Sequence, residues 1–393
     1  MHEDPLSNVR RHYQARFGSA PRVFRSPGRV NIIGEHTDYN QGYVLPAAIG
    51  NAAYVAACPR ADERIQLFSG HFGETFDIPL ADLVPSGRRW PDYILGVAAG
   101  MKKRGGSPGG FNMVIESDIP VGAGLSSSAA ISCAAAYALN EIWNLGFTKM
   151  ELARIAQDAE HEFAGVRCGI MDQFASLFGK KDHAMRLDCR SLEFEYVPLL
   201  LHDYRIVLFN TNVKHDLATT AYNTRRQQCE RGVEWVREKY PAVESLRDAT
   251  PAMLNEIVLP RDAEIHRRCL YVLEENDRLL RACEALKAGN IGALGKLMSE
   301  SHAGLSHAYE VSCPELDYLV DAVRHHPGVA GSRMMGGGFG GCTINLVQAD
   351  AVDALIKDLT HSYRAAMQRD LTAYITNTSD GTAEMQESPI AAV

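Results

Sequence analysis

The stretch PVGAGLSSSAA, residues 120 to 130, decides the fold, because it joins a strand to a helix through a glycine-rich turn. Residues 111 to 116 before it read as a strand, and the alanine-rich residues 126 to 143 after it strongly favour a helix. Gly122 and Gly124 let backbone N–H groups approach an anion, and the start of a helix adds free donors and a favourable dipole. We therefore expect this turn to bind phosphate.

Three consecutive serines follow the turn and can cap the helix, contact phosphate or ligate Mg²⁺. A plain serine cap without a ligand is the simpler alternative for this motif taken alone. The stretch contains no GKS or GKT, so it is not the common P-loop.

A second polar loop, PGRVNIIGEHTDYNQG at residues 27 to 42, is unusually rich in acids, amides and histidine. Such side chains are natural partners of sugar hydroxyls, since carboxylates accept several hydrogen bonds and histidine can donate or accept. A metal site built from Glu35, His36 and Asp38 is one alternative, and a solvated turn is another. No second cluster of ligands completes a metal site in the sequence.

A third loop, MMGGGFGG at residues 334 to 341, holds five glycines within six positions. That density indicates close approach of backbone to a ligand or to another part of the chain. Alone it does not distinguish the two.

Composition limits the class of protein. The chain has 393 residues, 46% of them hydrophobic, which is enough for two domains. A net charge of −8 argues against general binding to nucleic acid or to an anionic membrane. Neither a signal peptide nor an apolar run long enough to span a membrane is evident, and the nine scattered cysteines form no CxxC pair. We expect a soluble, cytoplasmic protein with free thiols.

Working outward, the pattern is α+β, with strands and helices partly segregated. We expect strands at residues 22 to 33, 185 to 197, 204 to 210, 342 to 347 and 371 to 377. We expect helices at residues 149 to 163, 222 to 240, 264 to 287, 291 to 306, 314 to 325 and 349 to 368. The domain boundary is placed near residue 203, dividing the chain into 1–203 and 204–393. The tail from Ser379 is expected to be poorly ordered.

Taken in this order, the three loops resemble the motifs of the GHMP small-molecule kinases, and GRVNIIGEHTDYN is similar to the signature of the galactokinase family. The resemblance extends over nearly the whole chain, through HEFAGVRCGIMDQF at 161 to 174, RRQQCE at 225 to 230, YEVSCPELDYLV at 309 to 320 and GSRMMGGGFGGC at 331 to 342.

The resemblance implies a two-domain fold, with an N-terminal domain like domain 2 of ribosomal protein S5 and a ferredoxin-like C-terminal domain. The active site would lie in the cleft between them. The implied reaction transfers the γ-phosphate of ATP to the C1 hydroxyl of α-D-galactose, giving galactose 1-phosphate and ADP, the first phosphorylation of the Leloir pathway. Mg²⁺ is the implied cofactor, galactose and ATP are the implied partners, and a monomer is favoured.

The resemblance also assigns roles position by position. Asp172 matches the catalytic aspartate and Arg29 the arginine that stabilises the transition state; both also face the sugar. Ser128 and Glu160 match the Mg²⁺ ligands, and Trp90 is aligned, more loosely, with a residue that stacks on adenine. The remaining galactose-binding residues are Glu35, His36, Asp38, Gly169 and Tyr222. The loop around the ATP phosphates comprises Gly122, Ala123, Gly124, Leu125, Ser126, Ser127 and Ser128.

Two alternatives keep the fold and change the function. One is a kinase for N-acetylgalactosamine, arabinose or a mevalonate-like alcohol, although the cluster from Glu35 to Asp38 favours a polyhydroxylated sugar. The other is a sensor that binds galactose and ATP without turnover. Sensors that resemble this family lose a Ser-Ala pair in the phosphate loop, whereas Ser128, Ala129 and Ala130 are present here.

Overall fold

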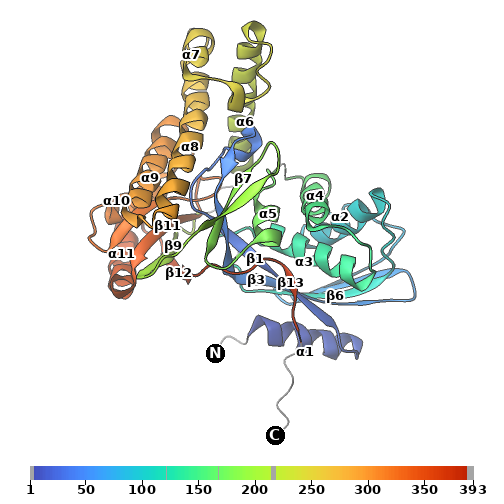
Figure 1. Ribbon diagram of the computed structural model, residues 1–393. Coiled ribbons are helices and arrows are strands. Elements are labelled where there is room, and N and C mark those ends of the chain that lie inside the picture. Colours follow the sequence, from blue (N-terminus) through green and yellow to red (C-terminus); the bar gives the residue numbers. More distant parts are fainter. Residues whose placement is uncertain (1–3, 121, 167, 214–217, 387–393) are drawn as a thin grey trace.

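A computed structural model describes residues 4–120, 122–166, 168–213 and 218–386. It contains two main sheets, each with helices on both faces (Figure 1). The first sheet has the strand order β13-β1-β3-β6-β4-β5, and the second has the order β10-β11-β9-β12. A small third sheet, β2-β7-β8, completes the set. This mixed α+β architecture agrees with the fold class expected from the sequence.

The first sheet takes most of its strands from the N-terminal half of the chain. Its strands are β1 (Arg22–Asn31), β3 (Pro46–Pro59), β4 (Arg64–Ser69), β5 (Glu74–Pro79), β6 (Phe111–Ser117) and β13 (Ala383–Glu384). One face carries α2 (Trp90–Lys103), α3 (Ser127–Ile142), α4 (Lys149–Glu162) and α5 (Met171–Phe178), while α1 (Pro5–Phe17) covers the other (Figure 1). Apolar side chains fill the space on both faces, so this sheet has a packed layer on each side.

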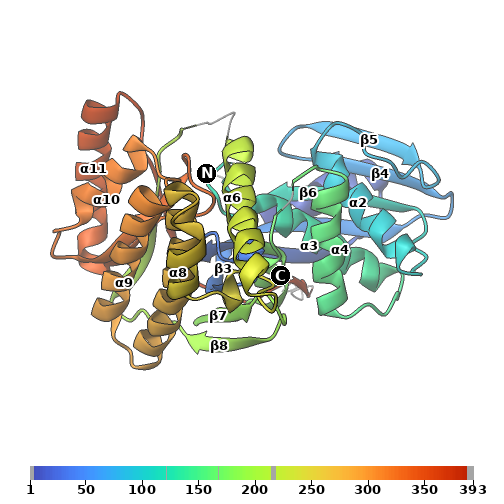
Figure 2. The same cartoon turned by 90° about the horizontal axis from the view of Figure 1, so that it is seen from above.

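The second sheet is built from β9 (Tyr204–Asn210), β10 (Val329–Met334), β11 (Cys342–Gln348) and β12 (Thr372–Thr376). The helices α10 (Pro314–Val323) and α11 (Val352–Met367) pack on one face, and α8 (Ala263–Lys287) and α9 (Ile291–Ala303) on the other. The helix α6 (Ala218–Lys239) runs beside α8, and the pair rises away from both sheets toward α7 (Pro251–Met253) (Figures 1 and 2).

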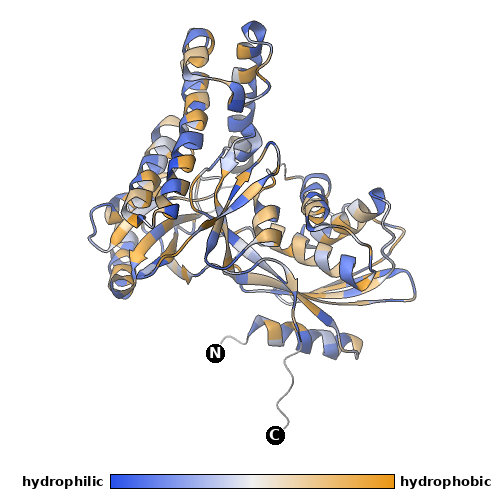
Figure 3. Cartoon of the chain, viewed as in Figure 1, coloured by the Kyte–Doolittle hydropathy of each residue, from blue (hydrophilic) through white to orange (hydrophobic). Residues whose placement is uncertain are grey.

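One apolar cluster joins the two halves. It includes Val30 and Ile32 from the first sheet, Leu208 and Ile344 from the second, and Leu279 from α8. Hydrophobic strands run through the middle of both sheets, whereas the projecting ends of α6 and α8 mix hydrophilic and hydrophobic residues (Figure 3). We propose that two domains divide near residue 203, between β8 (Phe194–Pro198) and β9, with β13 returning to the first.

Several expectations from the sequence are confirmed and others are wrong. The helix expected at 126–143 is α3, and the strand expected at 111–116 is β6. The single strand expected at 185–197 is instead the hairpin of β7 (His183–Asp188) and β8, because the chain reverses at Leu192, whose φ is 61°. The tail from Ser379 to Val393 was expected to be poorly ordered, and its residues 387–393 lie outside the described part of the chain. For the described part the expectation is wrong, because the Ser379 N–H donates to the Ala48 carbonyl at 2.9 Å and β13 pairs with β1.

Three helices, α1, α2 and α5, and the long strand β3 were not expected from the sequence. Among the helices that the structure describes, none combines the length and the apolar character needed to cross a bilayer.

Candidate active site

A cavity of about 280 Å³ collects the residues predicted to hold the sugar. It lies where loops after β1, before α5 and before β11 meet α6. The predicted residues on its wall are Arg29, Glu35, His36, Asp38, Gly169, Asp172 and Tyr222. Gly336, Gly337 and Gly338 of the third loop also line it. The structure therefore brings together every residue of the predicted sugar site. We call this space the sugar cavity.

The polar loop that supplies three of these side chains is held by helix α8. The Gly34 N–H donates to Glu275 Oε1 at 3.0 Å, and the Tyr43 N–H donates to Asn276 Oδ1 at 2.9 Å. Gly34 has a φ of +97°, a conformation that glycine tolerates and that turns the chain toward the cavity. A Cβ there would lie 2.5 Å from Leu279 Cδ1 of α8. The loop can approach α8 this closely because residue 34 is glycine.

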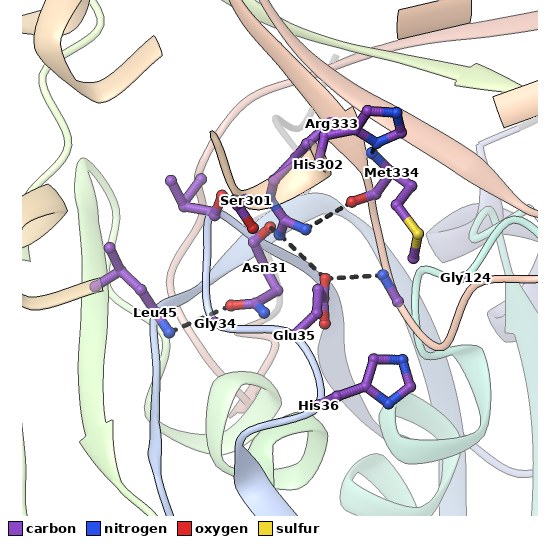
Figure 4. A network of polar contacts seen from close by, with 12 residues as sticks. Asn31, Gly34, Glu35, His36, Leu45, Gly124, Ser301, His302, Arg333 and Met334 are labelled. Carbon is purple, nitrogen blue, oxygen red and sulfur yellow. Dashed lines mark hydrogen bonds and ion pairs between the residues drawn. The ribbon is translucent and has the colours of Figure 1, made fainter. Parts of the chain in front are cut away.

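Glu35 is buried, with 2% of its surface exposed, and is held by the C-terminal half of the chain. Its Oε1 accepts hydrogen bonds from Arg333 Nη2 at 3.0 Å and from the Gly336 N–H at 2.8 Å (Figure 4). This carboxylate joins the polar loop to the glycine-rich loop. The glycine-rich loop thus has two roles, since it contacts the polar loop and also forms part of the cavity wall.

His36 lies against the aromatic rings of Tyr222 and Tyr309. Its Nε2 is 3.2 Å from the Gly337 carbonyl oxygen, and its Nδ1 is 2.7 Å from the Tyr39 hydroxyl. Because a carbonyl only accepts, Nε2 carries the proton and Nδ1 accepts from Tyr39. Burial lowers the pKa of His36 to about 4, so the ring is neutral at neutral pH. Both ring nitrogens are engaged, and the ring forms part of the wall.

Asp38 faces the cavity beside Gly169. A Cβ on residue 169 would lie 1.8 Å from Asp38 Oδ2, so glycine is needed there to make room for the carboxylate. Burial raises the pKa of Asp38 to about 6, and the nearby negative charges of Asp172 and Glu35 act in the same direction. Asp38 is therefore a carboxylate with few internal partners, well suited to accept hydrogen bonds from hydroxyls.

Asp172 lies in the first turn of α5 and forms a bidentate ion pair with Arg29 of β1. The distances are 2.8 Å from Nε to Oδ1 and 3.0 Å from Nη2 to Oδ2. The Ser126 hydroxyl also donates to Oδ2, and Arg29 Nη1 donates to the Gly124 carbonyl at 2.6 Å. These bonds connect the predicted phosphate loop directly to the predicted catalytic pair.

The phosphate loop has the backbone that its glycines predict. Gly122 and Gly124 have φ values of +77° and +72°, and Ser126, at 59°, is also left-handed before α3 begins. Ala123 and Leu125 are buried and anchor the loop. Ser127 and Ser128 open onto a second cavity of about 480 Å³. We call this space the nucleotide cavity.

Trp90 and Tyr93 of α2 also line the nucleotide cavity. Trp90 starts α2, is buried, and donates from Nε1 to Glu74 Oε2 at 3.1 Å. The structure therefore places the predicted adenine-stacking residue in the same cavity as the phosphate-loop serines.

Glu160 and Ser128 form the candidate metal site, of which Ser128 lines the nucleotide cavity. Ser128 Oγ lies 3.1 Å from Glu160 Oε2, and Gln173 Nε2 donates to Glu160 Oε1 at 2.6 Å. Burial raises the pKa of Glu160 to about 7, and the charge of Asp172 adds to the effect. Its neighbour Glu162 instead pairs with Lys103 on the surface. Of these two acids, only Glu160 turns inward.

The donor set fits Mg²⁺. A hydroxyl and a carboxylate are hard oxygen ligands, and Mg²⁺ is usually held by one or two protein groups together with phosphates and water. Within the described parts of the chain there is no group of three or more His, Cys, Asp or Glu side chains arranged to hold a metal without such a substrate.

Sequence reasoning missed several residues of the sugar cavity and of its support. Cys168, Met171 and Asn223 lie on its wall beside predicted residues, and their proximity along the chain was the available signal. Arg333, which holds Glu35, lies in β10 within the quoted GSRMMGGGFGGC motif. No pattern in the sequence links it to residue 35.

Three family models match the chain. They are described as the N-terminal domain of GHMP kinases at residues 92–180, the galactokinase galactose-binding signature at 11–59 and the C-terminal domain of GHMP kinases at 282–365. The signature covers the polar loop, and the N-terminal model covers the phosphate loop and Asp172. The matched segments thus contain most of the residues that line the two cavities.

Similar proteins and structures point the same way. The chain is 44% identical to a galactokinase of Thermotoga maritima, over 91% of this chain and 98% of the relative. It is 40% identical to a galactokinase of Roseiflexus, over 97% of both. A crystal structure of Lactococcus lactis galactokinase complexed with galactose superimposes with a TM-score of 0.92 and 34% identity, covering 97% of this chain and all of that one. A Methanococcus jannaschii mevalonate kinase shares the fold, with a TM-score of 0.67 and 18% identity over 92% of this chain and 99% of the kinase.

Proposed function

This chain belongs to the galactokinase family of GHMP kinases, and from that premise we propose that it transfers the γ-phosphate of ATP to the C1 hydroxyl of α-D-galactose. The products are galactose 1-phosphate and ADP. The observation that carries the proposal is the junction of the two cavities. There Ser126, at the end of the phosphate loop, donates to Asp172, and Arg29 bonds both Asp172 and Gly124.

Phosphoryl transfer needs alignment and charge stabilisation more than new covalent chemistry. Glu35, Asp38 and Tyr222 bind the sugar hydroxyls, with His36 and Gly169 shaping the wall. Backbone N–H groups of residues 122–128 and the start of α3 hold the phosphates. Arg29 stabilises the charge that develops on the transferred group.

Asp172 orients the C1 hydroxyl. Its carboxylate already accepts three hydrogen bonds, two from Arg29 and one from Ser126. These bonds engage both carboxylate oxygens and fix the side chain, so Asp172 acts mainly through position and charge.

Ser128 and Glu160 are the residues that would hold Mg²⁺. When bound, the ion neutralises charge on the β- and γ-phosphates. Glu160 must then be ionised, although burial favours its neutral form. Trp90 would stack on adenine in the nucleotide cavity.

We propose that the protein acts in the cytoplasm as a monomer and has no nucleic acid or membrane partner. All nine cysteines are free thiols and six are buried, which is typical of proteins that work where thiols stay reduced.

A substrate panel tests the proposal. Galactose, N-acetylgalactosamine, arabinose and mevalonate are each offered with Mg-ATP in a coupled assay for ADP, with Asp172→Asn purified in parallel as the background control. We expect galactose to be turned over fastest. Faster turnover of N-acetylgalactosamine would overturn the choice of sugar, and calorimetric binding of galactose without ADP release would indicate a sensor.

A further inference from the structure

Arg333 is one of the most deeply buried charges in the described chain, with no exposed surface, yet it lies on β10 outside the proposed chemistry. Its guanidinium donates from Nε to the Ile32 carbonyl at 2.8 Å and from Nη1 to the Met334 carbonyl at 2.6 Å. Nη2 donates to the Asn31 carbonyl and, at 3.0 Å, to Glu35 Oε1. One side chain of the second sheet therefore grips the end of β1 and the first acid of the polar loop (Figure 4).

The two oxygens of Glu35 have different surroundings. Oε1 accepts from Arg333 and from the Gly336 N–H, whereas no residue that the structure describes donates a hydrogen bond to Oε2. Glu35 lines the sugar cavity, and its second oxygen points to the side on which His36 lies (Figure 4). Arg333 thus determines which oxygen is left for a ligand.

The shape of the guanidinium matters as well as its charge. Three of its four hydrogen bonds go to backbone carbonyls, so they fix the arginine before it meets Glu35. A lysine would supply the charge without the planar fork that reaches several acceptors at once. Removing the fork would leave Glu35 free to rotate and to lose its bond to the glycine-rich loop.

Arg268 of α8 offers a matched comparison. It is equally buried and donates to the Ala308 carbonyl, to Glu264 and to Glu310. Both of its carboxylate partners are about half exposed, with 48% of each side chain accessible, and neither lines the sugar cavity. Burial and ion pairing alone therefore do not connect an arginine to the sugar.

We propose that Arg333 is a positioning residue for sugar recognition, which fixes the Glu35 carboxylate so that one oxygen binds the glycine-rich loop and the other faces galactose. The inference rests on the proposed function. It adds to that function a residue outside the cavity that determines affinity for the sugar.

The test compares Arg333→Lys with Arg268→Lys. Galactose affinity is measured by calorimetry, the KM for each substrate by the coupled assay, and Tm by thermal unfolding. We expect Arg333→Lys to weaken galactose binding at least tenfold, about the value of one charge-assisted hydrogen bond, with the KM for ATP within about twofold. Arg268→Lys should lower Tm comparably and leave galactose affinity within about twofold. Equal galactose affinities in the two variants would overturn the inference.

A double variant tests whether Arg333 acts through Glu35. If it does, the double variant should bind galactose less than about twofold more weakly than the Glu35→Gln single variant, because the effects of coupled residues are not additive. If the fold-losses in galactose affinity of the two single variants multiply in the double variant, the inference is contradicted. If Arg333→Lys does not fold, Glu35→Gln is the test, because it removes the ion pair from the other side. Both Tm and galactose affinity should fall in this variant. An unchanged Tm would overturn the inference.

The wild-type chain separates the two levels of the proposal. Wild type that binds no galactose overturns the proposed function together with this inference. If the wild type binds galactose and Arg333→Lys binds it with the same affinity, only the inference about Arg333 is overturned.

Discussion

The sugar cavity and the nucleotide cavity lie on either side of Ser126 and are built differently. Around the sugar cavity, Arg29, Glu35 and His36 are nearly inaccessible and are held by hydrogen bonds within the chain. The nucleotide cavity is larger, at about 480 Å³ against 280 Å³, and its outer wall includes exposed side chains such as Phe72, at 54%. A small rigid ligand meets a wall fixed beforehand, whereas a long charged ligand meets backbone donors and a few separate side chains.

This difference teaches where selectivity lies. Fixed partners lower the ordering cost of binding, and they make each change on the sugar side expensive because neighbouring groups lose partners too. Changes on the open side should be milder.

The largest effect is expected at the junction of the cavities, for Asp172→Asn. The amide keeps the shape of the side chain but loses the charge that faces Arg29 and the sugar hydroxyl. We expect kcat to fall by about 10²–10³-fold, the usual cost of removing one preorganised electrostatic group from a transition state. Single-turnover kinetics with galactose and ATP measure this fall. Activity within about tenfold of wild type would show that the reaction does not need the charge of Asp172.

A smaller effect is expected for Gly169→Ala on the sugar side. The added Cβ would lie 1.8 Å from Asp38 Oδ2 and must displace that carboxylate. Losing one charged hydrogen bond to the sugar should raise the KM for galactose roughly 10–100-fold, with the KM for ATP nearly unchanged. The control is Gly292→Ala in α9, where the nearest atom is 3.7 Å away. A galactose KM equal to that of the control would show that Asp38 does not bind the sugar.

The next effect is a pH dependence on the nucleotide side. With a pKa of about 7, the buried Glu160 is mostly ionised at pH 8 and mostly neutral at pH 6. Metal binding needs the ionised form, so affinity for Mg²⁺ with a nonhydrolysable ATP analogue should fall about tenfold between these values. Titration calorimetry of wild type and Glu160→Gln separates this from protonation of the nucleotide. An identical slope in both proteins would exclude Glu160 as a ligand.

The same pKa shift predicts a change in stability without metal. The folded chain holds the Glu160 proton up to about pH 7, whereas the unfolded chain releases it near the ordinary value of 4.5. Stability from this group therefore declines as pH rises from 4.5 to 7 and is constant above. In thermal unfolding without metal, the Tm of Glu160→Gln should rise relative to that of the wild type as pH increases from 4.5 to 7.

The smallest effect is expected for Trp90→Phe, on the wall of the nucleotide cavity. A smaller ring still stacks, so the KM for ATP should rise only roughly two- to fivefold, with the KM for galactose unchanged. Tryptophan fluorescence gives a second measurement: ADP should quench the wild type more than the variant. If Trp90→Phe changes the affinity for galactose and not that for ATP, Trp90 does not belong to a separate nucleotide site.

The sequence predicted the parts of this account that depend on local chemistry. The alanine-rich run specified α3, the glycines specified the left-handed turn before it, and resemblance to the GHMP kinases pointed to the residues that line the sugar cavity. What it did not predict depends on contacts between distant segments. Helix α1 is an exception, because it carries local signals that the sequence analysis missed: Asp4 caps its start, Pro5 is its first residue and Gly18 ends it in the left-handed region. Only the packing of Val9 and Tyr13 against the first sheet depends on distant segments.

The same limit applies within the site. Residues 35 and 333 are far apart in sequence, so their ion pair appears only when β10 lies beside the end of β1. The need for glycine at position 169 likewise follows from the position of Asp38, not from the backbone of its own loop. Local sequence identified the functional groups, and tertiary packing determined how each is held.

The most direct test of the account identifies the product. The purified chain is incubated with galactose, ATP and Mg²⁺, and the phosphorylated sugar is assigned by ³¹P and ¹H nuclear magnetic resonance. The account predicts α-galactose 1-phosphate, formed in equal amount to ADP and at least about 100-fold more slowly with Asp172→Asn. Phosphate on another carbon, or ADP formed without a sugar phosphate, would contradict it.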